Sequence, residues 1–135
     1  MADKPIVLIV DDERGVRELE RRILETGPYQ VIEASGAAEA FQILDAGQRI
    51  DLMISDLEMP DLSGEDMVMA VRTKRPGLKV LYVSGVVDRL LDARKVLGDG
   101  EAFLDKPFTS KGLLESVSLL LYDTMSPPIR NEASS

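Results

Sequence analysis

Short apolar runs and helix-like segments alternate five times along this chain, and that alternation restricts the possible folds more than any other feature. Short continuous apolar runs are typical of buried strands, whereas apolar residues three and four positions apart indicate helices. The predicted strands span residues 6–10, 30–34, 52–56, 78–85 and 102–108. The alternation predicts β-α-β units, and so one α/β domain with a doubly wound, five-stranded parallel sheet covered by helices on both faces.

The predicted helices are recognised by their apolar stripes. In the first helix, the stripe consists of Val16, Leu19, Ile23 and Leu24. The later stripes are Ala37, Ala40, Phe41 and Leu44; Met67, Ala70 and Val71; Val87, Leu90 and Leu91; and Leu113, Leu114, Val117, Leu120 and Leu121. The pattern is lost after residue 122, which divides the chain into a predicted domain at 1–122 and a predicted flexible tail or linker at 123–135.

The amino-acid composition excludes or disfavours several classes of function. The chain has 135 residues, no cysteine and no histidine, which excludes disulfides, thiolate metal sites and histidine-based acid/base or metal chemistry. Its net charge of −8 disfavours direct binding to nucleic acid, because two polyanions repel each other. No apolar run reaches the length of a membrane span and the N-terminus lacks the apolar segment of a signal peptide, so a cytoplasmic location without a membrane partner is expected.

Polar residues stand at the carboxyl ends of four of the predicted strands. Asp11 and Asp12 follow the first strand, and Asp56 ends the third. Ser84 lies at the end of the fourth strand and Lys106 toward the end of the fifth. Parallel strands present their carboxyl ends at one sheet edge, where α/β domains bind ligands. Carboxylates without histidine suit a hard cation, so we expect Mg²⁺, with Mn²⁺ or Ca²⁺ as substitutes, beside a phosphate contacted by Lys106 and a nucleophilic Asp56.

Each of these residues also has a purely structural interpretation. Asp11 and Asp12 suit the N-terminus of the following helix, and Asp56 suits a turn. Lys106 is compatible with an ordinary surface lysine, and Ser84 with a turn before a glycine. The coincidence of all five at predicted strand ends favours the site over these separate interpretations.

Four motifs carry a resemblance to a known family: VLIVDDE at 7–13, DLMISDLEMPDLSG at 51–64, VLYVSG at 80–85 and FLDKPF at 103–108. In this order and at these spacings they resemble the receiver domain of bacterial two-component response regulators, over about residues 4–122. The resemblance implies a flavodoxin-like (βα)5 fold with strand order 2-1-3-4-5. It also implies a phosphoprotein that is phosphorylated by a sensor histidine kinase or a phosphotransfer protein, controls a downstream protein, and catalyses nothing beyond its own phosphorylation and dephosphorylation.

The same resemblance implies a role for each residue of the site. Asp56 is the expected phosphoacceptor and a ligand of Mg²⁺. Asp12 would bind the ion directly, and Asp11 would help through a water molecule. Ser84 and Lys106 would hold the phosphoryl oxygens.

Further implied features concern the surroundings of the site. The backbone carbonyl of Glu58 would complete the metal ligands, and its acidic side chain is expected to alter the lifetime of the phosphoryl group. On phosphorylation Ser84 would move toward the phosphoryl group and Phe103, the expected switch aromatic, would turn inward. That movement would remodel the surface of the fourth helix, fifth strand and fifth helix, in a monomer or a phosphorylation-dependent homodimer. The bond between Lys106 and Pro107 is expected to be cis.

Other function classes remain open from the sequence. A Mg²⁺-dependent phosphohydrolase would use Asp56 as nucleophile, but such enzymes often have a second aspartate where this chain has Glu58, and no substrate-capping insert is present. A binding module with an inactive site is a third class, against which the complete acidic set argues. Within the receiver class, Met1 shortly before the first strand favours a stand-alone receiver or the start of a longer regulator. A receiver excised from a hybrid sensor kinase is the alternative, because VLYVSG and GEAFLDKPF also resemble that group.

Overall fold

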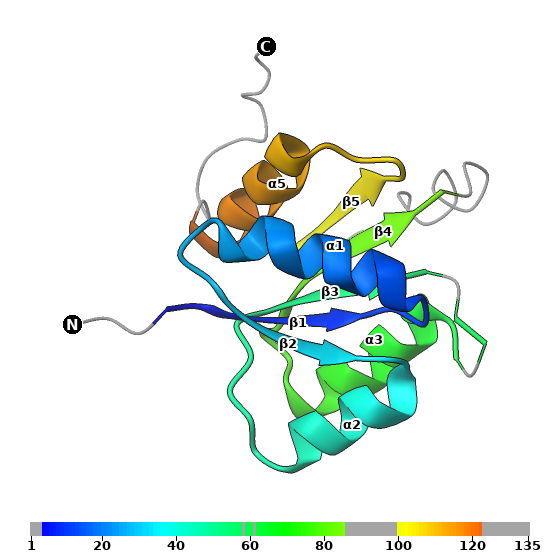
Figure 1. Cartoon of the computed structure of the whole chain (residues 1–135). Helices are drawn as coiled ribbons and strands as arrows, with labels where there is room; N and C mark the ends of the chain where they lie inside the picture. Colours follow the sequence, from blue (N-terminus) through cyan, green and yellow to red (C-terminus); the bar gives the residue numbers. More distant parts are fainter. Residues whose placement is uncertain (1–3, 58, 61, 86–99, 123–135) are drawn as a thin grey trace.

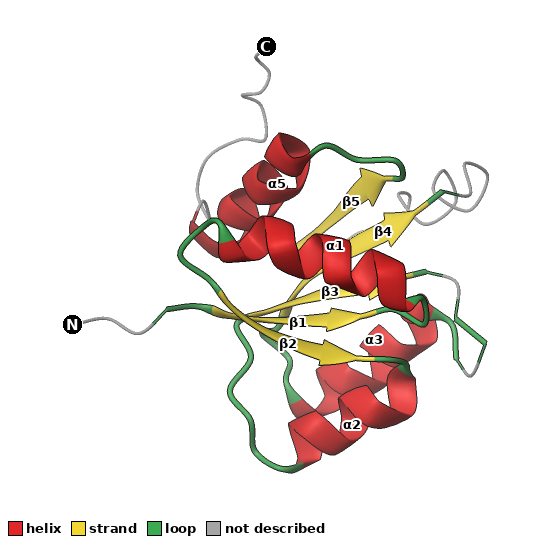
Figure 2. Cartoon of the chain, in the orientation of Figure 1, coloured by secondary structure: helices red, strands yellow, loops and turns green. Residues whose placement is uncertain are grey.

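The computed structural model describes residues 4–57, 59–60, 62–85 and 100–122 of the chain. In chain order, its elements are β1 Ile6–Val10, α1 Arg14–Glu25, β2 Gln30–Ala34, α2 Ala37–Asp45, β3 Leu52–Asp56, α3 Gly64–Lys74, β4 Lys79–Ser84, β5 Glu101–Asp105 and α5 Ser110–Tyr122 (Figure 2). The helix predicted around Val87, Leu90 and Leu91 lies outside the described residues. No helix within the described part of the chain is long and apolar enough to cross a membrane.

The five strands form one parallel sheet in the order β2-β1-β3-β4-β5. Helices α1 and α5 cover one face of this sheet, and α2 and α3 cover the other (Figure 1). The predicted fold class and strand order are therefore confirmed. The chain runs outward from β1 to β2 and then returns to β3 on the other side of β1. The strand order thus reverses between β1 and β3, and in open α/β sheets ligands bind beyond the carboxyl ends of the strands at such a point.

Both faces of the central strands are buried, which explains why their sequences are continuously apolar rather than alternating. In β1, Leu8 and Val10 belong to a core cluster shared with α2 and α3. Val7 and Ile9 belong to a second cluster, shared with α1 and α5. Because all four side chains are fully buried, β1 is fixed between two layers, and the residue that follows it has a defined position at the sheet edge.

The buried face of α1 differs from the predicted stripe by one position. Leu19, which the stripe placed in the core, is 51% exposed, whereas Glu20 is only 1% exposed. Glu20 stands four residues after Val16 and three before Ile23, so helical geometry places it on the inner side even though its side chain is acidic. Position 20 is therefore a core position occupied by a carboxyl group.

Candidate functional site

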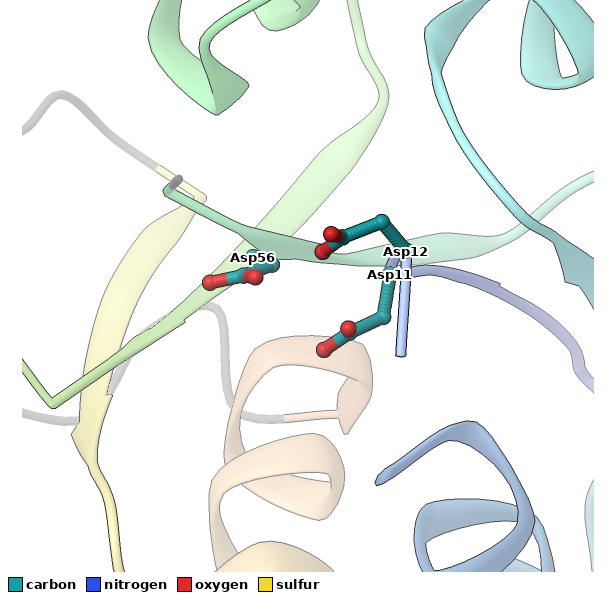
Figure 3. Close-up of side chains that lie close together, drawn as sticks. All are labelled: Asp11, Asp12 and Asp56. Carbon is teal, nitrogen blue, oxygen red and sulfur yellow. The ribbon is translucent and has the colours of Figure 1, made fainter. Parts of the chain in front are cut away.

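Three aspartates lie together at the carboxyl ends of β1 and β3 (Figure 3). The pairing of Val10 with Ser55 brings the two strand ends side by side, so Asp11 and Asp56 are delivered to the same place. One carboxylate oxygen from each of Asp11, Asp12 and Asp56 lies within 4.8 Å of the other two. Asp11 and Asp56 are buried and Asp12 is exposed, so the cluster opens to solvent on the side of Asp12.

The Asp11 carboxyl is the most enclosed group of this acidic cluster. Burial raises its pKa above the ordinary value, and a hydrogen bond from the backbone N–H of Glu13 (2.8 Å) and the charge of Lys106 offset part of that rise. The hydrogen bond from Glu13 also bears on the structural interpretation of Asp11, in which this residue serves the N-terminus of the following helix. Glu13 is the N-cap of α1 and makes no side-chain cap hydrogen bond. Asp11 therefore shapes the entry to the helix through one backbone contact, and its second oxygen faces Lys106.

Lys106 supplies a positive charge to the cluster. Its Nζ lies 3.8 Å from an oxygen of Asp11 and 3.8 Å from an oxygen of Asp56. Both distances are ion-pair distances but exceed those of hydrogen bonds, so the ammonium stands between the two carboxylates without being bound tightly to either. The backbone N–H of Lys106 donates to the carbonyl of Ser84 (3.0 Å), which ties the end of β5 to the end of β4.

The other predicted site residues have different positions relative to the cluster. Ser84 is the buried last residue of β4, one position beyond Val83, the register partner of Asp56. Phe103 is half-buried and packs on Tyr82, with ring centroids 5.3 Å apart. The Lys106–Pro107 peptide bond is cis. Glu58, a predicted ligand through its carbonyl, lies outside the described residues.

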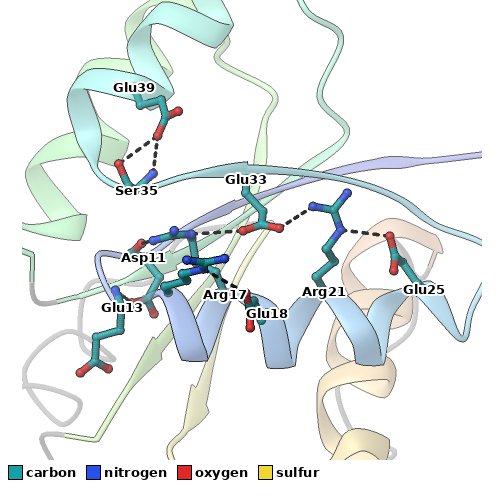
Figure 4. Close-up of polar contacts among 10 residues, drawn as sticks. Asp11, Glu13, Arg17, Glu18, Arg21, Glu25, Glu33, Ser35 and Glu39 are labelled. Atoms are coloured by element: carbon teal, nitrogen blue, oxygen red, sulfur yellow. Dashed lines mark hydrogen bonds and ion pairs between the residues drawn. The ribbon is translucent and has the colours of Figure 1, made fainter.

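An arginine that the sequence analysis did not single out fixes the backbone of Asp11 (Figure 4). Arg17 donates from Nη1 to the Asp11 carbonyl oxygen (2.8 Å) and from Nε to Glu33 (3.2 Å). Glu33 in turn pairs with Arg21, which also pairs with Glu25. This chain of charges joins α1 and β2 to the backbone of the first site residue, so it holds Asp11 in place without touching its carboxylate.

We expect Arg17→Met to reduce stability by about 1.5–3 kcal/mol, because the Arg17 side chain is only 15% exposed and both of its partners lose a charge-assisted hydrogen bond. Urea unfolding measures the change. Arg14→Met is the matched control: Arg14 stands on the same helix but is 82% exposed and pairs with the exposed Glu18. We expect little change for that control. An equal loss in both variants would contradict the role given to Arg17.

Gly64, the first residue of α3, packs directly against the backbone at the carboxyl end of β3. Its N–H donates to the carbonyl of Leu57 (3.0 Å). A Cβ at this position would lie 2.3 Å from the carbonyl oxygen of Asp56 and 2.9 Å from Oγ of Ser55. The helix can begin this close to the end of β3 only because residue 64 has no side chain.

Fold and site together define a class of protein: a flavodoxin-like α/β domain with an oxygen-only acidic cluster and a lysine at the point where the strand order reverses. Comparison with known proteins gives the family. The sequence profile described as "Response regulator receiver domain" matches residues 7–118. The chain therefore belongs to the response regulator receiver domain family, and it is a receiver domain of two-component systems.

Two curated relatives show the contexts in which such domains occur. The chain is 35% identical to the sensor kinase CckA of Brucella abortus (strain 2308) over 85% of its own length and 12% of that protein. It is also 35% identical to the response regulator protein FleR of Pseudomonas aeruginosa, over 83% of its own length and 24% of that protein. The chain thus spans a small part of each relative, one a kinase and one a regulator.

A solved relative adds information on ligands. The response regulator TrrA of Thermotoga maritima was crystallised in complex with Mg²⁺-BeF, and its chain is 30% identical to this one. The TM-score is 0.77, and the match covers 87% of this chain and 99% of that chain. Receiver domains are phosphoacceptor domains that bind Mg²⁺ at an acidic site and interact with histidine kinases or phosphotransfer proteins. The acidic cluster described here fits the first two of these properties, phosphorylation and Mg²⁺ binding.

Proposed function

We propose that Asp56 accepts a phosphoryl group from a phosphohistidine of a sensor kinase or phosphotransfer protein. The observation that carries this proposal is the position of Lys106, 3.8 Å from both Asp56 and Asp11 in a cluster of three carboxylates. Without a positive charge, a nucleophilic carboxylate in this cluster would repel the incoming phosphoryl oxygens. The ammonium of Lys106, which lies beside Asp56, can instead attract those oxygens. Phosphoryl transfer mainly requires such charge compensation together with correct positioning of the reacting groups.

The transfer exchanges one phosphorus bond for another. An oxygen of Asp56 attacks the phosphorus atom while the P–N bond to the donor histidine breaks, and the departing nitrogen takes up a proton. With acetyl phosphate as donor, the P–O bond to the acetyl oxygen breaks and acetate leaves. Lys106 and Ser84 donate hydrogen bonds to the phosphoryl oxygens, and the Asp56 side chain becomes an acyl phosphate.

The donor set of the site suits a divalent cation. Asp11, Asp12 and Asp56 offer oxygen ligands only, which is the preference of Mg²⁺. In our proposal Asp12 and Asp56 would bind the ion directly, Asp11 would help through water, and the carbonyl of Glu58 would complete the set. When bound, the ion supplies positive charge for the phosphoryl oxygens. The chain performs no turnover on an external substrate in this proposal.

The output of the domain would be a changed surface. Phe103 rests on Tyr82, half-buried on β5, and we propose that it turns inward when Ser84 moves toward the phosphoryl group. The surface that responds includes β5 and α5, where Lys111 and Glu115 form an exposed ion pair. A downstream protein, or a second copy of this chain, would recognise that surface. Residues 1–122 form the receiver in this proposal and 123–135 a tail or linker, either in a separate regulator or within a hybrid kinase.

We expect intact mass spectrometry to find one added phosphoryl group after incubation with acetyl phosphate and Mg²⁺. Asp56→Asn should gain none, and the protein in EDTA should gain none, because the acceptor or the charge compensation is missing. Asp105→Asn is the matched control: it removes an exposed carboxylate next to Lys106 and should retain the adduct. A phosphoryl group on Asp56→Asn would show that another residue is the acceptor.

A further inference from the structure

Arg17 of α1 makes a contact with the acidic end of β1 that the proposed function does not use. Its side chain is only 15% exposed. Nη1 donates to the carbonyl oxygen of Asp11 (2.8 Å), and Nε donates to a carboxylate oxygen of Glu33 on β2 (3.2 Å). A guanidinium is planar and its donors form a rigid fork, so two partners on different elements fix its orientation. Arg17 is therefore a rigid link between β2 and the backbone of the site.

The carbonyl that Arg17 holds belongs to the planar peptide unit that joins Asp11 to Asp12. Fixing its oxygen fixes the plane of that unit, and with it the direction in which Asp12 leaves the strand. Asp11 has further anchors, because its N–H donates to the carbonyl of Ala34 (3.2 Å) and its Oδ1 accepts from the N–H of Glu13 (2.8 Å). Asp12 is exposed, so packing does little to define its position. The Arg17 contact thus matters more for Asp12 than for Asp11.

The charge of Arg17 acts in the opposite direction to its geometry. A guanidinium beside the acidic cluster opposes a divalent cation on the carboxylates, because like charges repel. Glu33 offsets part of this charge, although it also pairs with Arg21. If the geometry dominates, loss of Arg17 weakens the binding of a divalent cation. If the charge dominates, the same loss strengthens it, so the sign of the effect distinguishes the two roles.

We propose that Arg17 is a positioning residue for the divalent cation, and that it acts by orienting the Asp12 carboxylate through the peptide unit between Asp11 and Asp12. The assignment rests on the proposed function, since it concerns the same site. Arg17 touches neither the cation nor the phosphoryl group in this role. It holds Asp12 close to Asp11 and Asp56, one oxygen of each within 4.8 Å of the others, against the mutual repulsion of three carboxylates.

The test measures the Kd for Mg²⁺ by titration calorimetry at one fixed pH. Arg17→Met should weaken Mg²⁺ binding roughly tenfold, the lower end of the losses found when a group that orients a metal ligand is removed. The double variant Arg17→Met/Glu33→Met has the net charge of the wild type and should show a similar loss. Higher ionic strength screens the charge effect but not the positioning effect, so the ratio of the Kd values should not shrink at high salt.

Arg75→Met is the matched control for a general loss of stability. Arg75 is also half-buried and donates to two carbonyl oxygens, those of Gln48 (2.8 Å) and Leu44 (2.9 Å). These carbonyls lie between α2 and β3, at the amino ends of the strands and so at the opposite edge of the sheet from the aspartates. Arg75→Met should lower the unfolding temperature and leave the Kd for Mg²⁺ unchanged. If Arg17→Met is too unstable to titrate, it is measured in a Gly15→Ala background, where the new Cβ meets no atom within 4 Å and alanine favours the helix.

Several outcomes would overturn the assignment. Mg²⁺ affinity that is equal or higher in Arg17→Met than in the wild type would show that Arg17 does not position the site. An equal loss of affinity in Arg75→Met would trace the effect to stability alone. A wild type that binds Mg²⁺ but gains no phosphoryl group from acetyl phosphate would refute the proposed function alone, because the affinities still decide the role of Arg17. A wild type that binds no Mg²⁺ would overturn both.

Discussion

Glu20→Leu is expected to stabilise the protein at pH 8 by up to roughly 5 kcal/mol relative to the wild type in the absence of divalent cations. The pKa of Glu20 rises from its ordinary value of 4.5 to about 8 in the folded protein, mainly because the carboxyl is buried. At ~1.4 kcal/mol for each pH unit, that difference corresponds to the stated free energy of unfolding. Leucine has a similar size and needs no hydrogen bond, so the cost of the buried carboxyl disappears.

The sign of the pH dependence follows from the direction of the shift. Below pH 4.5 the carboxyl is protonated in both the folded and the unfolded chain, and it contributes no difference. Between pH 4.5 and about 8 the unfolded chain releases the proton while the folded chain retains it, so stability falls as the pH rises. Above about pH 8 both states are ionised and the loss is complete. The stability difference between variant and wild type should therefore be smallest at pH 5 and largest at pH 8.

Urea unfolding at pH 5, 6, 7 and 8 in EDTA measures this difference, and other titrating groups cancel in the comparison. Glu20→Gln should remove the same pH dependence, because glutamine does not titrate. Glu25→Gln is the control on the same helix, where the carboxylate is half exposed and pairs with Arg21. If the wild type and Glu20→Leu keep a constant difference at all four pH values, Glu20 does not retain its proton in the folded state.

Gly64→Ala is expected to destabilise the protein by about 1–3 kcal/mol and to slow phosphorylation of Asp56 tenfold or more. The added Cβ would lie 2.3 Å from the carbonyl oxygen of Asp56, and backbone atoms cannot move aside as a flexible side chain does. Either α3 or the end of β3 must therefore shift. A displacement of the acceptor by a fraction of an ångström disturbs the alignment that phosphoryl transfer needs.

Thermal unfolding and the rate of phosphorylation by acetyl phosphate measure the two effects. Gly15→Ala provides a control of opposite sign. It adds the same methyl group in α1, where nothing lies within 4 Å of the new Cβ, and alanine favours the helix over glycine by up to about 1 kcal/mol. A Gly64→Ala variant as stable and as active as the wild type would mean that α3 tolerates a methyl group against β3.

The strands of the sheet could be predicted because the pattern that defines each strand lies within a few consecutive residues. Each central strand is a continuous apolar run, and each run ends at a polar residue, so the strand positions and the clustering of Asp11 with Asp56 follow from the sequence. The strand order came from the resemblance to the family rather than from the pattern. The boundaries of the last strand shifted, from 102–108 to Glu101–Asp105, because proline at 107 has no N–H to donate to a sheet.

The burial of Glu20 and the contact of Arg17 with Asp11 could not be predicted, because both depend on which face of α1 packs against the sheet. The predicted stripe of the first helix included Leu19 and left out position 20. In the structure the helix turns so that Glu20 is buried and Leu19 is half exposed. The contact of Arg17 with the Asp11 carbonyl also depends on this orientation. A periodicity test that includes charged residues at core spacing would have found position 20, four residues after Val16 and three before Ile23.

The site draws its carboxylates and its lysine from strands that are distant in the chain, which has a consequence for biosynthesis. Asp11, Asp56 and Lys106 follow or end β1, β3 and β5, so the acidic cluster is synthesised well before its positive charge. The charge that compensates the carboxylates reaches them only once β5 has paired with β4. In the proposed function, uptake of a phosphoryl group would therefore report that the whole sheet has formed.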